Sequence, residues 1–208
     1  MLELTTWIMI GFVSGSVPWA LLIGKTVVSK DIRTVGDGNP GAANVWKSGG
    51  WILGMLSVIL EIGKGMVPVC LATRYFYMDS NAALSTGLAL IAISPIVGHG
   101  WSPFLRFKGG KTLATSGGSW IAITGGIAFP VGCLFLLLMH CLQRNHAITV
   151  TFCWVGLLVV FLPLNMSPSI ALFGVTSLLI VVYKHRFEYG DGLIFRDWVH
   201  KLARALSW

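Results

Sequence analysis

Lys111 stands where a protein could bind phosphate. It follows the pair Gly109-Gly110 and precedes an apolar stretch, within GHGWSPFLRFKGGKTLATSGG at residues 98–118. Unpaired backbone N–H groups and the positive end of the helix dipole favour an anion at the start of a helix. The lysine would add a mobile cation, and the glycines would leave the N–H groups accessible. The alternative is a lysine that only reaches the membrane surface, which is the commoner role at the end of a span.

A second Gly-rich segment, GDGNPGAANVWKSGG, has glycines in the spacing of a dinucleotide-binding loop. It lacks the βαβ context of such loops, and FKGGKT is not a Walker A motif because residue 105 is leucine. Its glycines can still form an anion-binding nest, and its asparagines suit hydroxyl groups. The alternative is a flexible connector, which needs neither the tryptophan nor the lysine of NVWKSGG. The residues assigned to this pocket are Gly36, Asp37, Gly38, Asn39, Gly41, Asn44 and Lys47.

Several further polar residues are expected at or near the membrane. Glu61 and Lys64 lie three residues apart on one helix face, where they would either form an ion pair or leave Lys64 open to a ligand. His185 follows the last apolar stretch and is a candidate for substrate contact or proton transfer. His99 is expected to pin a loop through hydrogen bonds. His140 and His146 are expected on the opposite face and have no assigned role.

The composition indicates that the chain is an integral membrane protein. Hydrophobic residues make up 55% of the 208 and charged residues 11%, so most of the chain cannot be a solvated surface. One domain, residues 1–208, is predicted, since the spans use most of the length. The net charge of +7 points to cytoplasmic loops and lipid head groups, not to nucleic acid. The four cysteines suit neither disulfides nor zinc, and no metal ligands are predicted.

An all-α polytopic fold with seven transmembrane helices is predicted. The apolar stretches are 4–24, 51–73, 82–101, 112–142, 147–163 and 168–183, and the first is expected to be a retained span. The basic segments 25–47, 102–111 and the tail should share the cytoplasmic side, whereas the loops at 74–81 and 164–167 carry little charge. With six spans, the segment 102–111 and the tail would lie on opposite sides of the membrane, because three crossings would separate them. Gly125-Gly126 and Pro130 divide 112–142 into two segments, which are short or partly re-entrant. The N-terminus is then outside and the C-terminus cytoplasmic.

The ordered motifs resemble a known family. SGSVPWALLIGK, KDIRTVGDGNPGAANVWKSGG, LEIGKGMVPV, GHGWSPFLRFKGGKTLAT and YKHR are similar, in order and spacing, to the bacterial PlsY-type acyl-phosphate:glycerol-3-phosphate acyltransferases. The resemblance implies a seven-span inner-membrane enzyme that transfers an acyl chain from acyl phosphate to the 1-hydroxyl of glycerol 3-phosphate. The product is lysophosphatidic acid, and no cofactor is implied. The expected partners are the two substrates, the lipid bilayer and an enzyme that produces acyl phosphate.

The resemblance also assigns roles to individual residues. Lys111 and His185 would be catalytic, with Lys111 binding phosphate and His185 contacting the glycerol phosphate. An acyl phosphate is already activated, so positioning and charge stabilisation would suffice and no Ser-His-Asp triad is needed. Either the substrate phosphate or His185 would accept the hydroxyl proton. The predicted substrate-binding set also includes Lys64, His99, Gly109 and Gly110.

The sequence departs from the family pattern at several pocket positions. Asp37 replaces a serine, Lys47 replaces an arginine and loses its bidentate fork, and Glu188 stands where an asparagine is usual. Ala147 takes the place of a serine. These changes leave three alternatives: a divergent relative with another acceptor, a non-catalytic phosphate- or lipid-binding protein, and a transporter. A transporter should show internal repeats, and the sequence shows none.

Overall fold

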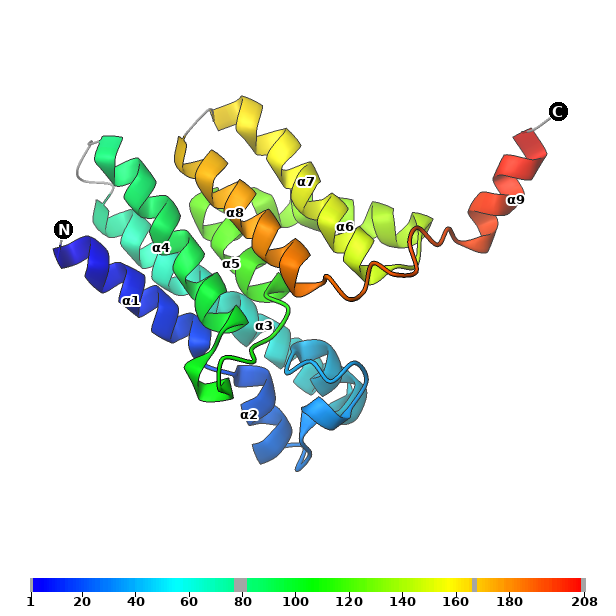
Figure 1. Cartoon of the computed structure of the whole chain (residues 1–208), viewed down its shortest axis with the longest axis horizontal. Helices are drawn as coiled ribbons and strands as arrows, with labels where there is room; N and C mark the ends of the chain where they lie inside the picture. The colour runs from blue at the N-terminus through cyan, green and yellow to red at the C-terminus, as the bar shows by residue number, and fades with distance from the viewer. Residues whose placement is uncertain (1, 77–81, 166–167, 207–208) are drawn as a thin grey trace.

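The computed structural model describes residues 2–76, 82–165 and 168–206, which form the helical chain shown in Figure 1. The prediction of an all-helical protein is confirmed. Parts of the two weakly charged loops, 77–81 and 166–167, lie outside the described residues. The elements are α1 Leu2–Ser16, α2 Trp19–Thr26, η1 Ile32–Thr34, α3 Ala42–Phe76, α4 Ala82–Gly100, η2 Pro103–Leu105, α5 Leu113–Ile123, α6 Ala128–Leu142, α7 His146–Asn165, α8 Pro168–Lys184 and α9 Asp197–Leu206.

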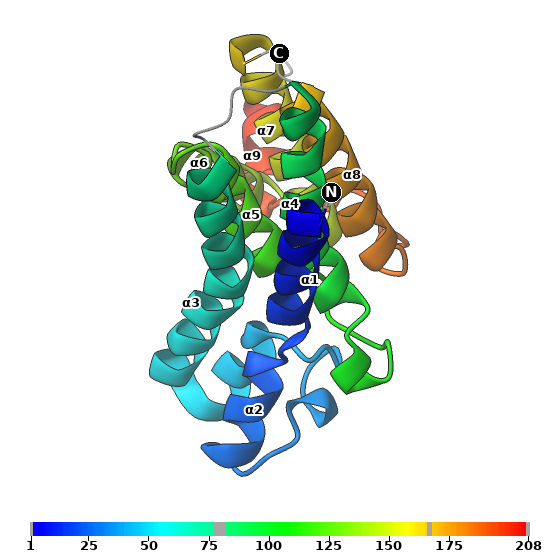
Figure 2. The same ribbon diagram turned by 90° about the vertical axis from the view of Figure 1, so that its left-hand side faces the viewer.

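The first apolar stretch forms two helices where one was predicted. α1 ends at Ser16 and α2 begins at Trp19. Pro18 lacks a backbone N–H and disfavours helical geometry at the preceding residue, so Val17 and Pro18 interrupt the helix. At this interruption the Val17 carbonyl accepts hydrogen bonds from the Trp19 backbone N–H at 3.1 Å and from the Lys64 ammonium at 2.8 Å. α2 and the loop that follows it lie together at one end of the bundle (Figures 1 and 2).

The predicted division of residues 112–142 is confirmed. α5 ends at Ile123 and α6 begins at Ala128. Gly125 and Gly126 have φ of 60° and 98°, a left-handed conformation that other residues rarely adopt. Pro130 does not form the break, because it lies within the first turn of α6, where a missing N–H is tolerated.

Glycines bring α3 and α5 into close contact. A Cβ atom on Gly65 of α3 would lie 2.1 Å from the Thr115 carbonyl oxygen, and one on Gly118 of α5 would lie 2.1 Å from the Ile62 carbonyl oxygen. Small residues of this kind are typical of helix contacts in membranes. The main core lies beside this contact, where Trp120 packs edge-on against Phe173 with ring centroids 5.0 Å apart.

Length and hydropathy allow four segments of the described chain to cross a membrane. They are Leu2–Thr26, Ala42–Tyr75, Thr86–Leu105 and His146–Leu164, whereas α6 and α8 are shorter apolar helices. α3 contains a kink at Gly50, where φ is 82°. A membrane protein is thus supported, and the number of crossings and the side of each terminus stay predictions.

The helix α9 was not predicted. It follows the bundle as a separate arm at the end of the chain (Figure 1). The tail was predicted only to be a basic segment on the cytoplasmic side.

Candidate active site

A cavity of about 890 Å³ lies between α3, α5, α6 and α7. Most of the polar residues that line it stand near helix ends: before or near the start of α3, α5 and α7, at the end of α4, and after the end of α8. Glu61 is the exception, because it lies within α3. The apolar lining comes from within the helices. The polar lining includes Asp37, Asn39, Lys47, Lys111, His146, His185 and Glu188, and the apolar lining includes Val58, Ile62, Ile121, Phe129, Leu136 and Leu157. The cavity therefore combines a polar rim with an apolar interior.

Lys111 lies at the centre of the polar rim. Its ammonium forms ion pairs with Asp37, at 2.5 Å, and with Glu188. Burial lowers the pKa of Lys111, but the two carboxylates outweigh it and raise the net pKa above its usual range. Lys111 is therefore a permanent cation, and its charge faces two carboxylates that the sequence analysis recognised only as departures from the family pattern.

Asp37 is fixed by the loop that carries it. Its Oδ1 accepts hydrogen bonds from Asn44 Nδ2 at 2.9 Å and from the Asn39 backbone N–H at 3.2 Å. Partial burial raises the pKa of Asp37, but the hydrogen bonds from Lys111, Asn44 and Asn39 outweigh it and lower the pKa to about 2. Asp37 is therefore an anion throughout the physiological pH range.

The glycines of this loop permit its shape. Gly36 and Gly38 have φ of 60° and 73°. A Cβ atom on Gly36 would lie 2.5 Å from Asn44 Oδ1 and 2.7 Å from Lys47 Nζ. Asn44 Oδ1 is buried without a hydrogen bond among the described residues. The loop thus brings the Lys47 ammonium of the rim close to the Asn44 amide oxygen.

Glu61, Lys64 and His99 form a buried cluster behind the rim. The Lys64 ammonium lies 2.6 Å from Glu61 Oε2, and His99 Nδ1 lies 3.1 Å from the same oxygen. The Ala20 backbone N–H donates to Glu61 Oε1 at 3.2 Å, which joins the start of α2 to α3. The ion-pair alternative is therefore the observed arrangement, and the Lys64 ammonium is directed toward Glu61 and Val17 and is not part of the cavity lining.

Gly109 and Gly110 pack closely against His99. A Cβ atom on Gly109 would lie 2.0 Å from the His99 carbonyl oxygen, and one on Gly110 would lie 2.3 Å from His99 Nε2. The Gly110 backbone N–H donates to the His99 carbonyl at 3.2 Å. These glycines let the loop before Lys111 pass directly over His99, which agrees with the prediction that His99 pins a loop.

His185 lines the cavity and has one ring nitrogen without a hydrogen-bond partner among the described residues. Its Nδ1 lies 2.8 Å from the Val181 carbonyl oxygen, which can only accept, so Nδ1 carries the proton. Nε2 is buried and has no hydrogen-bond partner among the described residues. Burial lowers the pKa of His185, the Val181 hydrogen bond opposes this, and the net pKa is below its usual value. His185 is therefore neutral near pH 7.

His146 was wrongly expected on the opposite face. Its ring lies 5.8 Å from the His185 ring, centroid to centroid, and it lines the same cavity. The predicted division of 112–142 was the available signal, because an additional crossing carries residues 143–146 to the side of His185. His140 lies at this end too, in the last turn of α6, outside the cavity lining.

Some of the predicted site residues thus line the cavity, and the others lie outside its lining. The predicted residues that line it are Asp37, Asn39, Gly41, Lys47, His99, Lys111 and His185. The predicted residues outside the lining are Gly36, Gly38, Asn44, Lys64, Gly109 and Gly110.

The cavity of this helical membrane protein has a cation at its polar rim and an apolar interior. These features are typical of proteins that bind an amphiphile with an anionic head group. The family model described as glycerol-3-phosphate acyltransferase matches residues 5–191. The glycerol-3-phosphate acyltransferase 1 of Thermotoga maritima is 32% identical over 193 residues, which cover 87% of this chain and 93% of the relative. The chain therefore belongs to the glycerol-3-phosphate acyltransferase family.

Two further comparisons agree. The glycerol-3-phosphate acyltransferase of Endomicrobium trichonymphae is 32% identical over 190 residues, which cover 86% of this chain and 87% of the relative. The crystal structure of PlsY (YgiH), an integral membrane glycerol 3-phosphate acyltransferase in its glycerol 3-phosphate form, superposes with a TM-score of 0.79. It is 22% identical and covers 96% of this chain and 98% of that one, so it establishes the shared fold.

Proposed function

We propose that this chain transfers an acyl group from acyl phosphate to the 1-hydroxyl of glycerol 3-phosphate, which yields lysophosphatidic acid and inorganic phosphate. Membership of the family supports an acyltransferase that uses glycerol 3-phosphate. The observation that carries the assignment is Lys111 at the rim of a cavity of about 890 Å³ with an apolar interior. The rim suits two phosphate groups, and the interior suits one acyl chain.

Lys111 and Lys47 would hold the substrate phosphates at the rim. Both side chains line the cavity, and each reaches it from a different loop. Asn39, which lines the cavity, would bind the glycerol hydroxyls, since an amide can both donate and accept hydrogen bonds. The acyl chain would lie along Ile62 and the other apolar residues of the interior. This arrangement would bring the 1-hydroxyl and the acyl carbonyl together, and positioning is the main requirement for an activated donor.

The proposed reaction begins with removal of the hydroxyl proton by His185 Nε2 or by a substrate phosphate oxygen. The alkoxide oxygen then bonds to the acyl carbonyl carbon, and the carbonyl oxygen gains the negative charge. When this intermediate collapses, the bond from carbon to the phosphate oxygen breaks and phosphate leaves. The Lys111 ammonium would stabilise the charge that develops on the departing phosphate. His146 would hold the neighbouring His185 ring in place.

The chain would work in the cell inner membrane as a multi-pass protein with seven crossings. The four segments long enough to cross, with the short helices α5, α6 and α8, supply that number. The N-terminus would be outside and the C-terminus cytoplasmic, with the polar rim on the cytoplasmic side. An enzyme that supplies acyl phosphate would be the partner on that side.

Asp37 and Glu188 favour a second candidate, in which the acceptor is an alcohol without a phosphate. Both carboxylates pair with Lys111 and would repel an incoming dianion. A neutral polyol such as glycerol could instead donate its hydroxyl hydrogens to them. Competition between glycerol 3-phosphate and glycerol at equal concentration distinguishes the two acceptors.

The test is acyl transfer by the purified protein in lipid nanodiscs. Palmitoyl phosphate and radiolabelled glycerol 3-phosphate should give labelled lysophosphatidic acid and one inorganic phosphate per product. Lys111→Ala should lose most of this activity, whereas Lys30→Ala, an exposed lysine outside the cavity lining, should keep it. Absence of product with palmitoyl phosphate, palmitoyl-CoA and palmitoyl acyl carrier protein alike would overturn the proposal. Normal turnover by Lys111→Ala would overturn the site assignment alone.

A further inference from the structure

The helix α9 has two distinct faces and lies outside the residues matched by the family model, which end at 191. Helical spacing puts Trp198, Leu202 and Ala205 on one side and His200, Lys201 and Arg204 on the other. Trp198 and Leu202 are 47% and 51% exposed. An amphipathic helix with tryptophan on its apolar side and cations on its polar side has the composition of a helix that lies in a membrane interface.

The start of α9 is fastened to the end of α6. Arg196 Nε donates to the His140 carbonyl at 2.6 Å, and Trp198 Nε1 donates to the Cys141 carbonyl at 2.9 Å. Asp197 accepts from Arg144 at 3.0 Å. Trp198 is therefore held at the level where an apolar helix ends, and this is the depth at which tryptophan is enriched in membrane proteins.

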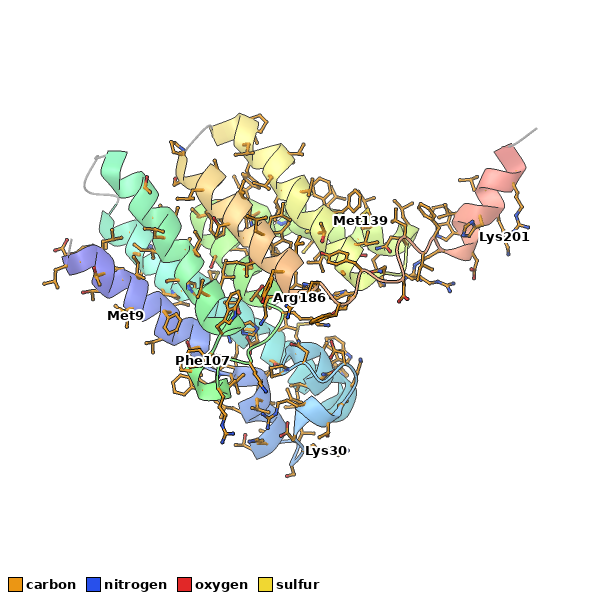
Figure 3. The ribbon with its side chains drawn as sticks, viewed as in Figure 1. Met9, Lys30, Phe107, Met139, Arg186 and Lys201 are labelled. Carbon is orange, nitrogen blue, oxygen red and sulfur yellow. The ribbon has the colours of Figure 1, made fainter. Side chains whose placement is uncertain are left out.

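The apolar face of α9 continues a surface that is already apolar. α6 exposes Leu134, Leu137 and Leu138 to 54%, 61% and 49%. Leu193 and Ile194, in the segment that leads to α9, are 53% and 40% exposed. Figure 3 shows Met139 on α6 and Lys201 on α9, with the arm extending away from the bundle. The lipid that covers the exposed side of α6 thus lies next to the face of α9.

We propose that α9 lies on the surface of a bilayer that contains anionic lipids. Trp198 and Leu202 enter the interface, and Lys201 and Arg204 contact the lipid phosphates. Juxtamembrane lysine and arginine side chains are attracted by the negative surface potential of such a leaflet. A second copy of the chain is the other possible cover for this face, but it would not account for cations on the opposite side of the helix.

Hydrogen–deuterium exchange of the full chain in nanodiscs tests this proposal. Each disc carries one chain, so a second copy cannot cover α9, and the lipid is phosphatidylcholine alone or phosphatidylcholine with phosphatidylglycerol. We expect the amides of 199–205 to exchange on the order of tenfold more slowly in the anionic discs. The double variant Lys201→Gln/Arg204→Gln should lose this difference. The matched control Lys25→Gln/Lys30→Gln removes two exposed lysines near α2 and should keep it.

The exchange of α7 amides shows that each variant keeps its fold. Equal exchange of 199–205 in the two lipid compositions would overturn the proposal. A difference that persists in Lys201→Gln/Arg204→Gln would also overturn it, since the cations would then have no part in binding. Because neither Lys201 nor Arg204 lines the cavity, acyl transfer by this variant should be unchanged, and its outcome is separate from that of the proposed function.

Discussion

The substitution Asp37→Asn should strengthen binding of glycerol 3-phosphate. It removes the negative charge that lies 2.5 Å from the Lys111 ammonium. Asparagine keeps an Oδ1 atom, so the hydrogen bonds from Asn44 Nδ2 and the Asn39 backbone N–H can remain. Asp37 is ionised above about pH 2, because its pKa is about 2, and its charge therefore opposes a phosphate at every working pH.

The size of the effect follows from the geometry. Two unit charges 4 Å apart interact by about 1 kcal/mol in water and about 4 kcal/mol at the dielectric of a protein surface. The Asp37 side chain is 45% exposed, so the lower end applies, and loss of its repulsion should contribute about 1.4 kcal/mol after solvent screening. This corresponds to a KM for glycerol 3-phosphate about tenfold lower, with little change in kcat.

Steady-state kinetics at saturating palmitoyl phosphate measures this prediction. The control is Asp31→Asn, because Asp31 is paired with Arg33 in the same loop region and does not line the cavity. It should leave KM unchanged. An unchanged KM in Asp37→Asn would refute the electrostatic reasoning. A higher KM would instead mean that Asp37 binds the acceptor.

Three further substitutions test other parts of the structure. His185→Gln should remove the acid limb of kcat/KM that arises when the His185 ring is protonated. Because the pKa of His185 is lowered, this limb should lie on the acidic side of the usual histidine value. A limb from the substrate phosphate would remain in both proteins, and identical profiles would contradict the role of His185. Glu61→Gln leaves the buried Lys64 ammonium without its charged partner at 2.6 Å, and this should lower the free energy of unfolding by about 3–5 kcal/mol. The Tm in detergent should fall, whereas Glu3→Gln at the exposed start of α1 should leave it unchanged, and equal Tm values for the two variants would contradict the prediction. Gly118→Ala places a Cβ atom against the Ile62 carbonyl oxygen and should lower the free energy of unfolding by about 1–3 kcal/mol. The control Gly117→Ala should have little effect, because a Cβ atom there has nothing within 4 Å, and similar losses in the two variants would contradict the packing argument.

Local residue types predicted much of the fold. The Gly125-Gly126 pair correctly indicated the end of α5. Glycine readily adopts the left-handed conformation that ends a helix, so residue type alone marks such a position. Pro18 carried an equally local signal, but continuous hydrophobicity on both sides concealed it. The helix α9 was missed because charged residues interrupt its apolar residues, and only helical spacing aligns Trp198 with Leu202.

The site was predictable where it depends on residue type and was not where it depends on packing between helices. Lys111 was singled out because a glycine pair precedes it at the start of an apolar stretch, and His185 because it directly follows the last apolar stretch. The ion pair of Lys111 with Glu188 was not identified, since 77 positions separate these residues and only the folded chain brings them together. The substitution at Asp37 was recognised, but its contact with Lys111 was not.

The most direct test of the central claim is transfer of the acyl group itself. Purified protein in nanodiscs, supplied with palmitoyl phosphate and radiolabelled glycerol 3-phosphate, should form 1-palmitoyl lysophosphatidic acid in proportion to the phosphate released, and the rate should fall by orders of magnitude in Lys111→Ala. Release of phosphate without labelled lysophosphatidic acid, or labelling of added glycerol in preference to glycerol 3-phosphate, would contradict the account.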